Sequence, residues 1–463
     1  MSLPRLSCLT LSLIAWGGRA WGQDAPCGPA SARTPDLANP AVLERLTTRD
    51  TAPGGMRLAI LARPMSCDTV VARVTVRFGD EVVLADRVPT VHIMRKMIGL
   101  GTSTMSGRMV RDSFARMSTT LSVSGSASRI SVLLRTTRRS LAPALALTAT
   151  LLRQPRFEQV AFDSVRADIL AGLREDSADV AAMASARLLQ AVSPYVPPHP
   201  LAPLSPEQEL RAFRRVSLED VRRVYADLVG GSVGDVAIVG PAARHEVRDL
   251  VTHVFADWRS PRPFALMLRR PYDPPGAVIA LAVPSAPTVL YRARRNISVA
   301  INSQRHAALV LGQYLFGGGF SRARLTGIPA HLATERPTSD LVITLGEGDG
   351  SLTIRAAATA ATFGALERAI AREIGRLRAD GVTQEEVEQA KSEWLREQRT
   401  TRASDEQIAV WLSNQWLVGR TFADDAAFER QVAALTPAAV NDALNEYLNP
   451  RRMTVVEAGP IPR

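Results

Sequence analysis

Residues Thr90–Thr102 read TVHIMRKMIGLGT, and the rest of the chain can be interpreted from this stretch. It predicts a helix over residues 88–100 that is closed by Gly99 and Gly101. Side chains at i and i+4 lie on the same side of a helix, so His92 and Lys96 share one face. A helix that presents two histidines at this spacing can bind one metal ion with both.

The same five positions are those of the inverted zinc-peptidase motif, H-x-x-E-H. In that motif two histidines bind zinc and the glutamate activates water. Here only His92 matches, because Arg95 stands at the base position and Lys96 at the second ligand position. Neither cation can bind Zn²⁺, and both repel it. The helix is therefore predicted to be a degenerate active-site helix.

Composition and charge indicate a globular protein that does not bind nucleic acid. The chain has 463 residues with 46% hydrophobic and 22% charged residues, and a formal net charge of +11. All its basic residues are arginine except Lys96 and Lys391. The arginines are scattered among acids, without an aromatic-basic stripe or a nucleic-acid-binding motif. Nucleic-acid binding is accordingly excluded.

The N-terminus is typical of an export signal. Arg5 precedes an apolar run, and Ala20-Trp21-Gly22 places small residues at a cleavage site before Gln23. Residues 1–22 are thus predicted to be a signal peptide, and residues 23–50 an extended arm. The protein is expected in the periplasm or outside the cell, with no integral membrane segment after cleavage. Cys27 and Cys67 remain, and either one disulfide or two free thiols would fit an exported chain.

Helix and strand signals divide the remainder into two α+β halves. The predicted domains are residues 51–258 and 276–463, joined by a linker at 259–275. Each half ends with a capped helix, a strand and a Gly-Pro pair. Ser217 corresponds to Thr436 and Gly240 to Gly459 at a constant offset of 219 residues. The second half is expected to begin with strands at 277–283 and 297–302. Both halves are predicted to be sandwiches of a mixed sheet with helices packed on it.

This organisation resembles the insulinase/pitrilysin-like zinc peptidases, in particular the two-domain subunits of the processing-peptidase type. The resemblance covers roughly residues 50–460. It is carried by the degenerate helix with its Gly101-Thr102 ending and by four further segments: Leu151–Phe157, His199-Pro200-Leu201, Leu315–Arg324 (LFGGGFSRAR) and Gly381–Lys391. The resemblance implies that the chain forms half of a clamshell.

The catalytic residues of that family do not carry over to this chain. The third zinc ligand is a glutamate in the family and falls on Gly172 here, with Asp168 and Glu175 one turn to either side. Arg324 matches the substrate-orienting arginine, but the tyrosine position holds Ala330 or His331. No catalytic residue, metal site or cofactor is therefore predicted. The resemblance implies a substrate-binding role for Gly317, Gly318, Gly319, Ser321 and Arg324.

Other motifs are better explained by structure than by chemistry. His245, Asp249 and His253 are each four residues apart and would share a helix face, which is most simply a solvated face, although metal binding there stays open. His199, His306 and His331 have no short ligand spacing. Gly230–Gly234 fits G-x-S-x-G, but it lies between a helix and a strand, the reverse of a nucleophile elbow.

The predicted function is an exported, catalytically inactive insulinase-like subunit. It would pair with an active zinc-peptidase subunit to bind peptides and help degrade or process them. Arg95 and Lys96 would then bind substrate carboxylates or pair with acids of the degenerate site. One alternative is a free-standing peptide-binding or structural homodimer. Another is an active zinc peptidase with a displaced site that uses His92, Asp168 or Glu175.

Overall fold

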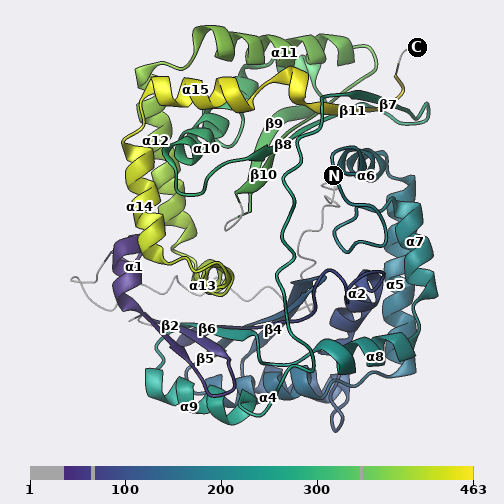
Figure 1. Ribbon diagram of the computed structural model, residues 1–463, viewed down its shortest axis with the longest axis vertical. Coiled ribbons are helices and arrows are strands. Elements are labelled where there is room, and N and C mark those ends of the chain that lie inside the picture. Colours follow the sequence, from purple (N-terminus) through teal and green to yellow (C-terminus); the bar gives the residue numbers. More distant parts are fainter. Residues whose placement is uncertain (1–35, 64–67, 345–347, 462–463) are drawn as a thin grey trace.

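The computed structural model describes residues 36–63, 68–344 and 348–461. Within them the chain forms two mixed sheets that lie at opposite ends of the molecule (Figure 1). The predicted signal peptide and both Cys27 and Cys67 lie outside the described residues. Among the described residues, no helix is long and apolar enough to span a membrane.

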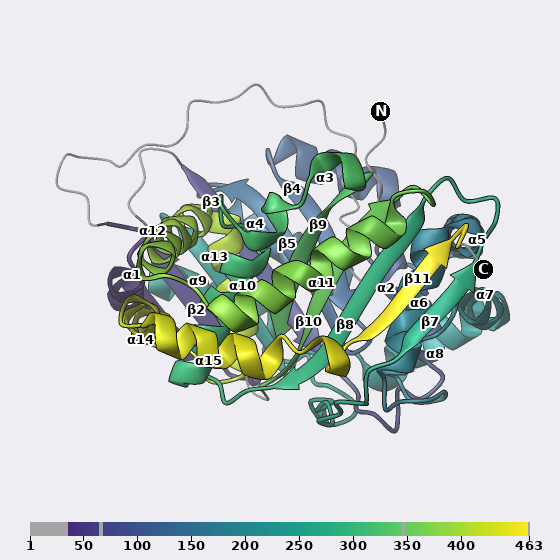
Figure 2. The same cartoon turned by 90° about the horizontal axis from the view of Figure 1, so that it is seen from above.

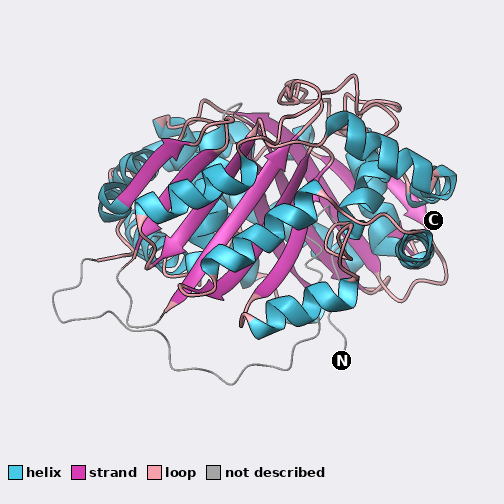
Figure 3. Ribbon diagram, turned by 90° about the horizontal axis from the view of Figure 1, so that it is seen from below, coloured by secondary structure: helices cyan, strands magenta, loops and turns pink. Residues whose placement is uncertain are grey.

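The first sheet has six strands, and its only parallel pair is β2 with β6. Its order is β1 (Thr47–Thr51), β2 (Arg57–Ala62), β6 (Gly234–Gly240), β3 (Thr69–Arg77), β5 (Arg129–Thr137) and β4 (Thr120–Ser126). The outer face of this sheet is apolar. It packs on five helices: α2 (Val88–Met97), α3 (Gly107–Arg116), α4 (Leu141–Arg153), α8 (Leu218–Leu228) and α9 (Arg244–Phe255). Figure 3 shows helices over strands from this side.

The second sheet has five strands, in the order that the first sheet has when β1 is left out, and its parallel pair, β7 with β11, corresponds to β2 with β6. Its order is β7 (Val278–Ala282), β11 (Thr454–Gly459), β8 (Val289–Ser298), β10 (Asp349–Ala358) and β9 (Glu335–Ile343). Three helices cover its outer side, α10 (Gln304–Phe316), α11 (Phe363–Asp380) and α15 (Pro437–Tyr447), as Figure 2 shows for α11 and α15. Three 3₁₀ turns, η1 (Arg324–Gly327), η2 (Ala330–Leu332) and η3 (Pro450–Arg452), complete this half.

The remaining helices connect the two halves. They are α5 (Gln159–Ala178), α6 (Val180–Ala191) and α7 (Pro206–Arg215) on one side, and α12 (Gln384–Thr401), α13 (Asp405–Leu417) and α14 (Phe422–Ala433) on the other (Figure 1). Two of them pack on the sheet of the opposite half. Ile408 and Leu412 of α13 cover Val71 and Val239 of the first sheet. Leu188 of α6 covers the second sheet in the same way. The predicted boundary therefore separates the two sheets but not their cores.

Two expectations about local structure are wrong. Residues 40–51 do not form an extended arm, because Asn39 caps a helix α1 (Pro40–Leu46) with Pro40 at its first position, and β1 then joins the first sheet as the partner of β2. The strand expected at 297–302 is instead the end of β8, which begins at Val289. The arginines at 292, 294 and 295 hid this strand, although its buried positions alternate with them.

The strand-terminal glycines of both sheets stand in equivalent surroundings. Gly240 and Gly459 have φ of 133° and 142°. A Cβ on Gly240 would lie 2.8 Å from the Thr69 carbonyl oxygen, and a Cβ on Gly459 would overlap that of Thr288. Thr69 and Thr288 begin or precede the neighbouring strands β3 and β8. Both positions require glycine, because a side chain there meets backbone and a positive φ.

Candidate functional site: a degenerate peptidase helix

The helix α2 forms as predicted, and its burial explains why. Val91, Ile93, Met94 and Met97 are fully buried in the core beneath the first sheet. The other face carries His92, Arg95 and Lys96, all of which are only partly exposed. The helix is thus fixed by its apolar side and does not depend on the three residues at the motif positions.

His92 is held as a neutral side chain. Its ring meets the edge of the Phe213 ring on α7, with a centroid separation of 5.4 Å. Burial lowers its pKa to about 3, and the positive charges of Arg95 and Lys96 act in the same direction. The neighbours that replace a glutamate and a histidine therefore oppose any charge on this imidazole.

The pKa of Lys96 is affected by charges on α2 and α5. Burial and the nearby Arg95 lower its pKa, while the carboxylate of Asp168 on α5 raises it. Gly172 is exposed on the same helix, and a Cβ there would meet nothing within 4 Å. Glu175 is also exposed. The position where the family has its third ligand thus offers no donor atom, and the positive charge of Lys96 interacts with the carboxylate of Asp168 instead.

The described residues do not fit a metal ion. Among them, no group of three His, Cys, Asp or Glu side chains could hold one. His245, Asp249 and His253 do fall on one helix, α9, and all three are exposed. His306 is buried, which lowers its pKa to about 4, and its Nδ1 accepts a hydrogen bond from Asn302 N at 3.3 Å. His199 stacks on Tyr195.

The glycine-rich turn Gly317–Gly319 follows α10 and is tightly packed. A Cβ on Gly317 would lie 2.6 Å from Leu325 Cδ1, and Gly319 has φ +125°. Ser321 Oγ donates to Glu393 at 2.7 Å, and Arg324 forms a 2.7 Å ion pair with Glu386. Both acids belong to α12. The two polar side chains expected to bind substrate are therefore already engaged within the chain, and their substrate role stays a prediction.

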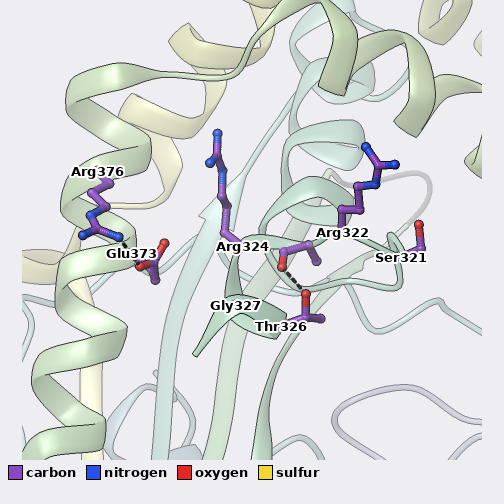
Figure 4. Close-up of a pocket in the computed structure, with 8 residues that line it drawn as sticks. Ser321, Arg322, Arg324, Thr326, Gly327, Glu373 and Arg376 are labelled. Carbon is purple, nitrogen blue, oxygen red and sulfur yellow. Dashed lines mark hydrogen bonds and ion pairs between the residues drawn. The ribbon is translucent and has the colours of Figure 1, made fainter. Parts of the chain in front are cut away.

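Beside this turn lies a shallow pocket of about 470 Å³. Figure 4 shows its lining, in which Arg324 and Arg322 project on one side and Glu373 pairs with Arg376 on the other. The three glycines are not part of the lining. Ala330 and His331, at the expected tyrosine position, lie exposed in η2. No aromatic hydroxyl therefore occupies this position.

Sequence reasoning missed a polar cluster on the inner face of the first sheet, the face that α13 covers. Arg73, Thr75 and Arg77 alternate along β3, and Asp235 lies on the neighbouring β6. Arg77 and Asp235 form an ion pair whose side chains are 5% and 3% exposed. Burial raises the pKa of Asp235, while Arg77 opposes that shift. The regular spacing of Val71, Arg73, Thr75 and Arg77 was the available signal, because it places three polar residues on one face.

Comparison with known proteins agrees with this geometry. The family described as the Peptidase M16 inactive domain matches residues 215–393, which include the glycine-rich turn but not α2. A search of curated proteins found no significant match.

Solved structures match between 89% and 100% of this chain. The M16 inactive domain from Pseudomonas fluorescens superposes with a TM-score of 0.78 and 18% identity over 90% of this chain and 98% of that one. A protease from Helicobacter pylori superposes with a TM-score of 0.75 and 15% identity, over 89% of this chain and 99% of that one. The periplasmic protease PqqL from Escherichia coli superposes with a TM-score of 0.74 and 15% identity, over 100% of this chain and 49% of PqqL.

The fold is thus that of the M16, or insulinase-like, peptidases. Residues 215–393 match the model of the Peptidase M16 inactive domain. This match and the solved structures confirm the predicted resemblance to a degenerate member and agree with the expectation that the chain is not a catalyst.

Proposed function

We propose that this protein is an exported, non-catalytic M16 subunit that binds peptides and pairs with an active subunit bearing H-x-x-E-H. The observation that carries the proposal is α2 itself. The helix is intact and buried, but its base and second-ligand positions hold Arg95 and Lys96. A folded scaffold without metal-binding chemistry fits a binding or supporting role better than hydrolysis.

The comparison with PqqL supports a paired arrangement. It spans about half of PqqL, which is called a periplasmic protease. A second chain of similar size would complete an assembly of that length. The predicted signal peptide would bring this chain to the same compartment as such a partner.

Co-purification tests the proposal. The chain is tagged in its native host, recovered from the exported fraction, and its partners are identified by mass spectrometry. We expect a second M16 chain with an intact H-x-x-E-H motif, and a complex that contains zinc and cleaves peptides while the isolated chain does neither. Recovery of a self-dimer alone would support the free-standing peptide-binding protein. Zinc and cleavage in the isolated chain, both lost on His92→Ala, would refute the non-catalytic role.

A further inference from the structure

The inner face of the first sheet carries more positive charge than its neighbours neutralise. In the antiparallel pair β3–β5, Arg77 lies directly opposite Arg129, and Thr75 lies opposite Ser131. Arg73 donates to Ser131 Oγ at 3.2 Å. Like charges directly opposite each other on neighbouring strands destabilise a sheet. Among the described residues, Asp235 is the only acid that forms an ion pair with this group, and it pairs with Arg77.

Part of this charge has a structural explanation. Arg77 donates to the Ser413 carbonyl at 3.0 Å, and Arg129 donates to Asn414 Oδ1 at 3.0 Å. Both acceptors lie in the last turn of α13, where the helix dipole favours cations. This arrangement gives partners to two nitrogens of Arg77 and to one nitrogen of Arg129. The Nε atoms of both residues are buried and without a hydrogen-bond partner in the described structure.

Arg95 brings a further cation to the same place. Its side chain passes Gly125 on the edge strand β4, where a Cβ would lie only 2.9 Å from Arg95 Cδ. Burial lowers the pKa of Arg95, and so does the charge of Arg129. The described structure gives Arg95 no hydrogen bond and no ion pair. The charges of Arg95 and Arg129 are therefore close enough to repel each other, and no acid in the described structure forms an ion pair with either of them.

We propose that Arg95 and Arg129 together bind a carboxylate of a peptide. The inference rests on the proposed peptide-binding function and names the chemistry that the peptide must carry. Guanidinium groups present planar forks that match carboxylates bidentately, and a bound anion would relieve their mutual repulsion. The site does not include Lys96, whose positive charge is opposed by Arg95 and favoured by Asp168 on α5. The carboxylate can belong to an acidic side chain or to the peptide C-terminus.

Calorimetric titration of the purified chain with three short peptides of otherwise identical sequence tests the site. The first carries a glutamate and an amidated C-terminus, the second a glutamine and a free C-terminus, and the third a glutamine and an amidated C-terminus. We expect at least one acidic peptide to bind about ten-fold or more tightly than the third, with a preference that weakens in high salt. The stronger of the first two identifies the source of the carboxylate.

Variants locate the binding. Arg95→Gln and Arg129→Gln should each reduce the affinity for the acidic peptide to that for the neutral one. Arg135→Gln is the matched control: it lies on the same strand, β5, but its side chain is 60% exposed and pairs with Glu406. This variant should bind as the parent does. Circular dichroism and the melting temperature verify folding, and Arg95→Gln should melt no lower than the parent because it removes repulsion.

The outcomes separate this inference from the proposed function. Equal affinity for all three peptides, or an unchanged preference in Arg95→Gln and Arg129→Gln, would overturn the carboxylate site while leaving peptide binding intact. Binding of none of the peptides would contradict the peptide-binding function and the site with it. Selective binding of an acidic peptide by a chain that recovers no M16 partner would leave the site standing and overturn the pairing.

Discussion

Replacing Asp235 with asparagine should strongly destabilise the first sheet. The carboxylate is fully enclosed and ion-paired to Arg77, and it attracts Arg73 as well. Desolvation, together with repulsion by Arg129 and Arg77, already lowers the pKa of Arg73 to about 10. Breaking a buried ion pair by removing one partner costs roughly 3–5 kcal/mol, because the other charge stays buried without compensation. Asparagine can keep one hydrogen bond to Arg77, so we expect a loss of about 3 kcal/mol.

Urea unfolding followed by circular dichroism measures this loss from the shift in midpoint. The matched control is Asp340→Asn in the second sheet. Asp340 pairs with Arg355, but the two side chains are 48% and 28% exposed, so the change should cost about 0–1 kcal/mol. A loss below about 1 kcal/mol for Asp235→Asn would show that solvent screens the pair. It would also undermine the view that this face holds buried, under-compensated positive charge.

Three further predictions concern other positions. Gly240→Ala should destabilise the protein by roughly 1–3 kcal/mol, because the new Cβ would meet the Thr69 carbonyl and the backbone has φ 133°. Gly172→Ala in the helix α5 should stabilise the protein by about 0.5–1 kcal/mol, because its Cβ would meet no atom within 4 Å. Thermal melts of the two variants compare these effects. Burial raises the pKa of Glu209 to about 7, so the free energy of unfolding should fall as the pH rises from the pKa of glutamate in the unfolded chain towards 7. Glu209→Gln should be as stable as the parent near pH 4 and more stable by roughly 1–3 kcal/mol at pH 8, as measured by urea titrations. Because burial lowers the pKa of His92 to about 3, its ring resonances should not titrate between pH 5 and pH 8, and stability should be lost as pH falls from 6.5 towards 3.

The elements that the sequence predicted well are those whose signals are local. The helix at α2 has an apolar face and glycines at its end, and the capped helices α8 and α15 begin with Ser217 and Thr436 as expected. The exchange of α6 and α13 between the halves was not predictable in the same way. An apolar helix face indicates that the helix is buried, but it does not say against which sheet.

The candidate site could also be predicted only where the sequence signal is local. The substitutions at Arg95 and Lys96 could be recognised by comparing the sequence with the H-x-x-E-H motif. The effect of Arg129 on Arg95 could not be predicted in this way, because Arg129 comes from β5, far from the motif in the sequence. Only the pairing of β3 with β5 brings Arg77 opposite Arg129. The number of charges on this face therefore follows from sheet register, which a single sequence specifies only through the alternation of its strands.

The structure also explains how this scaffold can lack the peptidase residues and still fold. The side of α2 that packs against the sheet is made of Val91, Ile93, Met94 and Met97, and none of these is a motif position. The motif face meets α5, α7 and the edge strand β4, and its three side chains are partly exposed. There the two cations Arg95 and Lys96 stand where the motif has a base and a metal ligand. Where the motif has a glutamate and a histidine for zinc chemistry, this helix carries two cations, with no change required in the core beneath it.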